Sequence, residues 1–206
     1  MSTSTPDTEG QRAQQRGSHL NLPNALTWLR ILMIPAIIVL FYLPYGWADP
    51  AACAGFAIAG ITDSLDGYYA RKLGLTSRLG AFLDPVADKL IVAAALVLIV
   101  SKDPRWFVVI VAIVIIGREI AVSALREWMA EIGASGRIKV SIWGKVKTIM
   151  QIVGLSLLLF RQDLLGIPIY RLGLFLTALA AVLTLWSMIL YLRLAWPELR
   201  GSSSIS

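Results

Sequence analysis

Long apolar stretches alternate with short polar connections along this chain, and the pattern predicts six helices. The apolar stretches cover residues 25–43, 49–71, 80–100, 105–128, 146–160 and 172–196, and the fifth can also be counted from about residue 142. An α-helix of about 20 apolar residues crosses the roughly 30 Å hydrocarbon core of a bilayer. The stretches are near that length, and the connections between them are short. We therefore expect an all-α integral membrane protein, a bundle of six transmembrane helices forming one domain over residues 19–198.

Polar segments flank this domain, a tail at residues 1–18 that we expect to be mobile and a short tail at 199–206. An even number of spans places both termini on the same side. Most of the 19 Lys and Arg residues fall on that side, whereas the opposite connections hold only Lys102, Arg105, Arg161 and Arg171. Because Lys and Arg concentrate in cytoplasmic segments, both termini are expected to be cytoplasmic.

Composition agrees with a membrane protein: 57% of the residues are hydrophobic and only 16% are charged. The net charge of +6 is explained by a positive inner face beside anionic lipid, so no nucleic acid partner is implied.

Four aspartates interrupt the apolar pattern. Asp63 and Asp66 lie near the end of the second stretch, and Asp84 and Asp88 lie near the start of the third. A charge within a membrane helix costs about 2.5–3.5 kcal/mol even on lenient scales, so these acids are expected to face a polar cavity. At about 100° per residue each pair falls on one face of its helix. The short connection at 71–79 makes the two helices antiparallel neighbours, and their acidic faces can converge at the cytoplasmic end.

Convergent carboxylates repel one another unless a cation neutralises them, and hard divalent cations prefer oxygen ligands. Two alternatives are salt bridges with Arg71, Arg78 or Lys89, and a cation-transport site. The stretches 51–61 and 90–100 beyond the acids are almost wholly apolar. This indicates a cavity open to one side of the membrane rather than a pathway through it.

The acids belong to a longer pattern that resembles the signature of the CDP-alcohol phosphotransferase family. The matching residues are Asp63-x₂-Asp66-Gly67-x₂-Ala70-Arg71-x₈-Gly80-x₃-Asp84-x₃-Asp88. All eight fixed positions are present, and the likeness extends from about Asn21 to the sixth stretch.

This resemblance implies transfer of a phosphatidyl group from CDP-diacylglycerol to a small alcohol, with release of CMP. It implies two Mg²⁺ or Mn²⁺ ions held by Asp63, Asp66, Asp84 and Asp88, with Asp88 also acting as the general base. It further implies a homodimer in a bacterial inner membrane, surrounded by membrane lipid, with the active site facing the cytoplasm.

The same resemblance suggests which residues bind the CDP-diacylglycerol donor. Small residues at Gly67, Ala70 and Gly80 leave space for the cytidine end, and Arg71 can pair with the diphosphate. Polar contacts on the nucleotide side are expected from Asn24, Thr27 and Arg30, which recur every three residues on the first helix. Capping of the helix is an equal alternative for Asn24.

Softer cues within the family favour sn-glycerol 3-phosphate as the acceptor, namely the sequences at 21–30, 80–89, 117–119 and 143–148. Cardiolipin, phosphatidylinositol-phosphate and phosphatidylserine synthesis are the alternatives. A phosphate monoester needs a basic site, for which Arg118, Lys145, Lys147 and Arg78 are the candidates. Arg118 lies deep in the fourth stretch, where an unused cation is costly, although a pair with Glu119 or with a motif aspartate would also explain it.

Overall fold

Six helices make up the described part of the chain, as the hydrophobic pattern predicts. The computed structural model describes residues 22–73, 78–133 and 142–199. The helices are α2 (Leu22–Tyr42), α3 (Ala48–Leu73), α4 (Arg78–Lys102), α5 (Trp106–Glu131), α6 (Ile142–Phe160) and α7 (Ile169–Leu199). No β-strand occurs within these ranges beyond one isolated bridge between Leu164 and Ile167. The all-α expectation is confirmed, and the helix ends fall within a few residues of the predicted ones.

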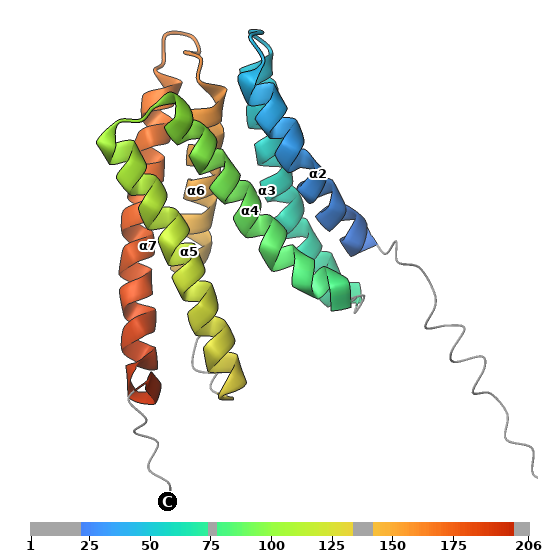
Figure 1. The fold of residues 1–206 in the computed structure, drawn as a ribbon, viewed down its shortest axis with the longest axis vertical. Coiled ribbons are helices and arrows are strands. Elements are labelled where there is room, and N and C mark those ends of the chain that lie inside the picture. The colour runs from blue at the N-terminus through green and yellow to red at the C-terminus, as the bar shows by residue number, and fades with distance from the viewer. Residues whose placement is uncertain (1–21, 74–77, 134–141, 200–206) are drawn as a thin grey trace, which may run out of the picture.

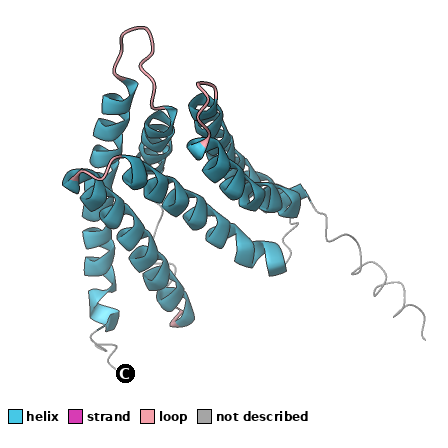
Figure 2. Cartoon of the chain, turned by 45° about the horizontal axis from the view of Figure 1, so that its top comes forward, coloured by secondary structure: helices cyan, strands magenta, loops and turns pink. Residues whose placement is uncertain are grey.

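The helices alternate in direction along the bundle (Figure 1). The connections 43–47, 103–105 and 161–168 lie together at one end, which we call the far end; they are the loops drawn in pink in Figure 2. The start of α2, the end of α3, the start of α4 and the end of α7 lie at the other end, which we call the acidic end. The start of the first helix, α2, and the end of the last helix, α7, therefore lie at the same end of the bundle.

Within the bundle, α2 packs against both α3 and α4, and α6 packs against both α7 and α3. Helix α5 packs against α7 and, less extensively, against α4. As expected, α3 and α4 run antiparallel and touch. Over the described residues, however, α3 and α4 each pack more extensively against α2 than against one another. The first helix is thus placed to contribute side chains to the acidic face of α4.

The core is apolar, and so is much of the outer surface. Residues such as Phe41, Phe56 and Leu155 are at most 2% exposed, whereas Trp106 is 74% exposed and Trp186 66%. Large apolar side chains on the outside of a helical bundle are typical of a surface that faces lipid. Trp186 therefore lies mostly on the outer surface of the bundle.

Two of the described helical segments, Trp106–Glu131 and Ile169–Arg193, are long and apolar enough to cross a membrane. Thr27–Tyr42, Ala48–Thr62 and Val146–Phe160 are shorter apolar segments. The apolar residues of α3 are followed in the same helix by Asp63 and Asp66. A membrane protein with at least these two spans is supported; six spans with cytoplasmic termini stay a prediction.

The closest approach between helices is that of α6 and α7, at two glycines. A Cβ atom added to Gly154 would lie 2.5 Å from Oγ1 and 2.9 Å from the backbone nitrogen of Thr177. One added to Gly173 would lie 2.9 Å from the backbone oxygen of Gly154. Small residues allow such contact between backbones in membrane helix pairs. This packing fixes the position of α7 relative to α6.

Candidate functional site

The acidic half of the site begins on α4, where Asp84 and Asp88 lie one turn apart and are both partly buried. The hydroxyl of Thr27, on α2, donates a short hydrogen bond to Oδ1 of Asp84. Thr27 and Arg30 are each only 1% exposed. The polar face of α2 predicted from Thr27 and Arg30 is thus turned inward, and at Thr27 it meets a signature aspartate.

The other signature positions are placed on helices, but their side chains lie outside the described part. Asp63 and Asp66 fall in the last three turns of α3, where the apolar run has ended. Seven other predicted residues also lie on helices while their side chains are outside the described part: Asn24, Gly67, Ala70, Arg71, Arg78, Gly80 and Lys145. Asn24 lies within the first turn of α2, which begins at Leu22, so the capping alternative does not fit the start of this helix. Among the described side chains, no group of three or more His, Cys, Asp or Glu residues gathers, and the ligand set stays a prediction.

The basic half of the site lies between α5, α6 and α7. Arg118 is 8% exposed, and its Nη2 donates to Oε1 of Gln151 at 3.1 Å and pairs with Oε2 of Glu119 at 2.8 Å. Lys147 is 7% exposed, and its Nζ donates to Oγ of Ser187 at 2.9 Å. The charges of Arg118 and Lys147 repel one another across the α5–α6 interface. The structure therefore brings together two of the predicted acceptor residues.

A third cation joins them through an aromatic ring. Arg126 donates from Nη2 to the hydroxyl of Tyr191 at 3.3 Å, and its guanidinium lies 5.4 Å from the centre of that ring. Lys147 Nζ lies 6.0 Å from the same ring. We call Arg118, Arg126 and Lys147 the cation cluster. Polar and aromatic groups hold the three cations in place. Among the described residues, the acid that pairs with one of them is Glu119, which contacts Arg118.

This arrangement leaves the cluster with an excess of positive charge. Nε of Arg118 is buried and has no hydrogen-bond partner among the described residues. A desolvated cation without full compensation is costly, so the site favours an incoming anion. The Asp88 carboxylate on α4 also attracts the charge of Arg118. Asp88 is thus near enough to Arg118 for their charges to interact, whereas the groups in contact with Arg118 are Gln151 and Glu119.

Four residues of this site are absent from the sequence prediction: Arg126, Gln151, Ser187 and Tyr191. Their spacing carries a signal. Gln151 follows Lys147 by one helical turn, and Ser187 and Tyr191 are also one turn apart, so each pair lies on one helix face.

The fold and the site define the chain as a helical membrane protein with an acidic pair on α4 and a cation cluster on α5 and α6. The chain belongs to the CDP-alcohol phosphatidyltransferase family, whose sequence profile matches residues 20–190. Because the family is one of transferases, its match favours an enzyme over the cation transporter considered from the sequence.

Individual relatives are similar over nearly the whole chain. A Pseudomonas fluorescens protein is 50% identical over 184 residues, covering 88% of this chain and 93% of the relative. A Salmonella choleraesuis protein is 48% identical over 179 residues, covering 87% and 97%. A Shigella flexneri serotype 5b protein is 47% identical with the same coverage. All three are named CDP-diacylglycerol–glycerol-3-phosphate 3-phosphatidyltransferase.

Proposed function

We propose that this protein transfers the phosphatidyl group of CDP-diacylglycerol to sn-glycerol 3-phosphate, giving phosphatidylglycerophosphate and CMP. The names of relatives about half identical over almost their full length support this activity. The observation that carries the choice of acceptor is the cation cluster, in which Arg118 and Lys147 are buried and Arg118 is attracted by the charge of Asp88. An acceptor with a phosphate dianion and a nearby hydroxyl matches these two features.

The donor end of the site is assigned to the four signature aspartates. Asp63, Asp66, Asp84 and Asp88 supply only oxygen atoms, and Thr27 orients Asp84, so the residues present fit Mg²⁺ or Mn²⁺. Two such ions, when bound, would neutralise the diphosphate and make CMP a better leaving group.

Other residues would hold the rest of the donor. Gly67, Ala70 and Gly80 leave room for the nucleotide, and Arg71 is placed by sequence beside the acids to meet the diphosphate. Asn24, Thr27 and Arg30 line the α2 side.

Asp88 is assigned as the general base. Its carboxylate takes the proton from the 1-hydroxyl of glycerol 3-phosphate while that oxygen attacks the phosphorus of the phosphatidyl group. The bond from this phosphorus to the bridging oxygen breaks, and the electron pair leaves with CMP. The attraction between Asp88 and Arg118 supports this role, because the cation that binds the acceptor phosphate lies near the base.

The cation cluster is assigned to the acceptor phosphate. Arg118 offers a planar fork suited to phosphate oxygens, and Lys147 adds a compact charge. Arg126 extends the set, and Lys145 and Arg78 are further candidates from the sequence.

The setting of the reaction follows from the same proposal. We assign residues 19–198 to six membrane spans with both termini cytoplasmic, in a bacterial inner membrane and as a homodimer. The site then opens at the cytoplasmic leaflet, where the lipid donor arrives sideways and glycerol 3-phosphate arrives from water.

The test is CMP release by the purified protein with CDP-diacylglycerol and a panel of acceptors. We expect turnover with glycerol 3-phosphate, little with serine, inositol phosphate or phosphatidylglycerol, and dependence on divalent metal. Asp88→Asn should lower turnover by about 10²–10⁴-fold, as for loss of a general base. Equal turnover with uncharged acceptors, or full activity of Asp88→Asn, would contradict the assignment.

A further inference from the structure

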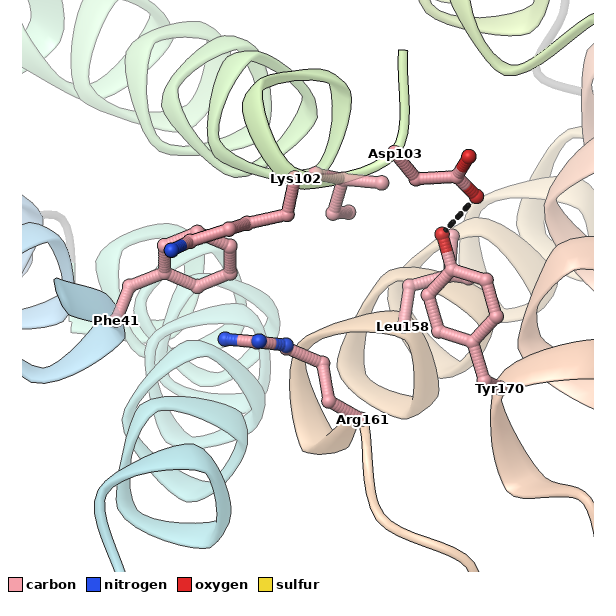
Figure 3. Close-up of a pocket in the computed structure, with 7 residues that line it drawn as sticks. Phe41, Lys102, Asp103, Leu158, Arg161 and Tyr170 are labelled. Atoms are coloured by element: carbon pink, nitrogen blue, oxygen red, sulfur yellow. Dashed lines mark hydrogen bonds between the residues drawn. The ribbon is translucent and has the colours of Figure 1, made fainter. Parts of the chain in front are cut away.

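A cavity of ≈ 270 Å³ lies at the far end of the bundle, away from the candidate functional site. It sits among the ends of α2, α4 and α6 and the start of α7 (Figure 3). Its lining combines apolar with polar and charged side chains: Phe41, Ile99, Lys102, Asp103, Leu158, Arg161 and Tyr170. Nothing in the proposed transfer reaction uses these residues.

Two cations from different helices extend toward this cavity. Lys102 reaches in from the end of α4 and Arg161 from the residue after α6, and both approach Phe41 (Figure 3). The guanidinium of Arg161 lies 5.1 Å from the centre of the Phe41 ring, and its Nη1 is 3.1 Å from Oδ1 of Asp49. Lys102 is exposed and contacts the Tyr42 ring, and within the described residues no carboxylate forms an ion pair with it.

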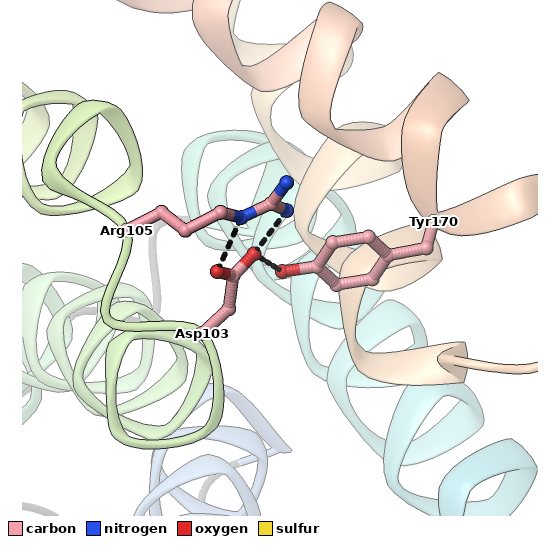
Figure 4. Close-up of polar contacts among 3 residues, drawn as sticks. All are labelled: Asp103, Arg105 and Tyr170. Carbon is pink, nitrogen blue, oxygen red and sulfur yellow. Dashed lines mark hydrogen bonds and ion pairs between the residues drawn. The ribbon is translucent and has the colours of Figure 1, made fainter.

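Asp103, the carboxylate in the lining, forms no ion pair with Lys102 or Arg161 among the described contacts, because Arg105 and Tyr170 already donate hydrogen bonds to it. Asp103 accepts hydrogen bonds from Nε and Nη2 of Arg105 at 2.6 and 2.5 Å and from the Tyr170 hydroxyl at 2.5 Å (Figure 4). The hydrogen bonds from Arg105 lower the pKa of Asp103 to about 2, with a further contribution from Tyr170. Asp103 is therefore a charged anchor for the start of α7. Because Asp49 pairs with Arg161, the excess positive charge of the cavity comes from Lys102, which has no ion pair among the described residues.

The backbone at Arg161 is a second, independent sign of a ligand site. Its φ is 56°, in the left-handed region, which costs an L-residue other than glycine roughly 1–2 kcal/mol. At the residue after a helix this conformation is usually taken by Gly or Asn. Here it directs a long cation back over Phe41. Strained backbone of this kind clusters at ligand clamps, where the surrounding structure holds it in place.

We propose that this cavity binds the phosphate of an anionic phospholipid headgroup at the far-end surface of the membrane. Lys102 supplies a compact charge and Arg161 a planar fork, which together suit phosphate oxygens. The cavity of ≈ 270 Å³ is open to the surface, so a headgroup phosphate can enter it while the acyl chains stay in the bilayer. The far end is where lipid headgroups meet the bundle if α5 and α7 span the membrane. This site is independent of the transfer reaction at the acidic end.

Lipid binding to the purified full-length protein in neutral detergent tests this proposal. Thermal unfolding is followed while phosphatidylglycerol, zwitterionic phosphatidylcholine or inorganic phosphate is titrated, and bound lipid is counted by native mass spectrometry. The variants are Lys102→Gln and Arg161→Asn, the second chosen because Asn tolerates left-handed backbone. Arg171→Gln is the matched control, since Arg171 is an exposed cation at the same end but does not line the cavity.

We expect phosphatidylglycerol to stabilise the wild-type protein and phosphatidylcholine to have little effect. The apparent affinity should fall about tenfold or more in Lys102→Gln and Arg161→Asn, as expected for loss of a charge-assisted hydrogen bond, and stay unchanged in Arg171→Gln. If inorganic phosphate reproduces the stabilisation in a Lys102-dependent way, the phosphate site stands and the ligand is the free anion. Equal stabilisation of all four proteins, or none of the wild type, overturns the proposal.

Turnover measured on the same samples separates this site from the proposed function. Lys102→Gln should keep CMP release within about twofold of wild type while its lipid affinity falls. An inactive wild-type protein that still binds lipid through Lys102 would contradict the proposed function alone.

Discussion

Substitution of Gln151 by Leu isolates the contact that orients Arg118. The Gln151 amide oxygen accepts a 3.1 Å hydrogen bond from Nη2 of Arg118, and the Gln151 side chain is only 4% exposed. Leucine is similar in size and keeps the packing between helices, but it accepts no hydrogen bond. The guanidinium is then left with Glu119, a neighbour on its own helix, and is expected to turn away from α6.

The size of the effect follows from this contact. A hydrogen bond to a charged group contributes about 1.5–3 kcal/mol, and each 1.4 kcal/mol is a factor of about ten in binding. Nε of Arg118 already lacks a partner among the described residues, so nothing there replaces the lost contact. We expect Gln151→Leu to raise the KM for glycerol 3-phosphate about ten- to hundredfold. The kcat and the KM for CDP-diacylglycerol should change little, because the acids on α4 are untouched.

A second substitution at the same position tests charge rather than geometry. Gln151→Glu places a carboxylate beside Arg118, which neutralises part of the cation cluster and repels a phosphate dianion. Its effect on the acceptor KM should therefore exceed that of Gln151→Leu. Ser156→Ala is the matched control, since Ser156 is buried on the same helix and donates only to the backbone of Ile152.

The assay is CMP release with each substrate varied in turn, in detergent and at saturating divalent metal. The reasoning is refuted if Gln151→Leu and Ser156→Ala give the same acceptor KM. It is also refuted if Gln151→Leu lowers kcat alone, because the contact would then serve the chemical step or the fold and not acceptor binding.

Three further predictions follow from other contacts. Thr27→Val removes the donor to Asp84 and should raise the divalent-metal concentration for half-maximal activity about tenfold or more, with recovery in Thr27→Ser. Gly154→Ala should destabilise the protein by about 1–3 kcal/mol, read from its unfolding in detergent, because the new Cβ meets the backbone of α7. Gly117→Ala is its control, since a Cβ there meets nothing within 4 Å, and equal effects would contradict the packing argument. The protection factors of the 103–105 connection, meaning hydrogen-exchange rates corrected for the intrinsic effect of pH, should stay constant from pH 7 to 5 and fall as pH falls from about 3.8 toward 2, because the pKa of Asp103 is lowered on folding and its stabilisation is lost only on protonation. Asp103→Asn should abolish this pH dependence.

The helices were predictable because membrane helices carry a strong and simple signal. A run of apolar residues bounded by charges fixes each helix to within a turn, and α5 is an example, predicted over 105–128 and found at Trp106–Glu131. Helix α6 begins at Ile142, the earlier of the two predicted starts, whereas α7 begins at Ile169, a few residues before its apolar run, because the first turn of a helix tolerates polar residues near the membrane surface.

The site was predictable only where a full charge stands inside an apolar run. Asp84 and Arg118 were identified in that way, because each is costly unless it binds something. Ser187 and Tyr191 were missed because small hydroxyls and tyrosines are common in membrane helices and do not stand out. Arg126 was missed for a different reason. It is a cation near a helix end, and the enrichment of Lys and Arg on the cytoplasmic side already explains such a residue.

The division of the site between two groups of helices constrains which acceptors the protein can use. The acids come from α3 and α4, with support from α2, whereas the cations come from α5 and α6 and are held by α7. In the proposed assignment, an acceptor places its hydroxyl at Asp88 and its phosphate at Arg118 at the same time. The position of Lys147 relative to Ser187 is set by backbone contact, because Gly154 on α6 and Gly173 on α7 leave no room for a side chain between these two helices. A phosphate attached directly to the reacting carbon, or no phosphate, would engage only one half. Selectivity for the acceptor is then a property of helix packing as much as of the residues that touch it.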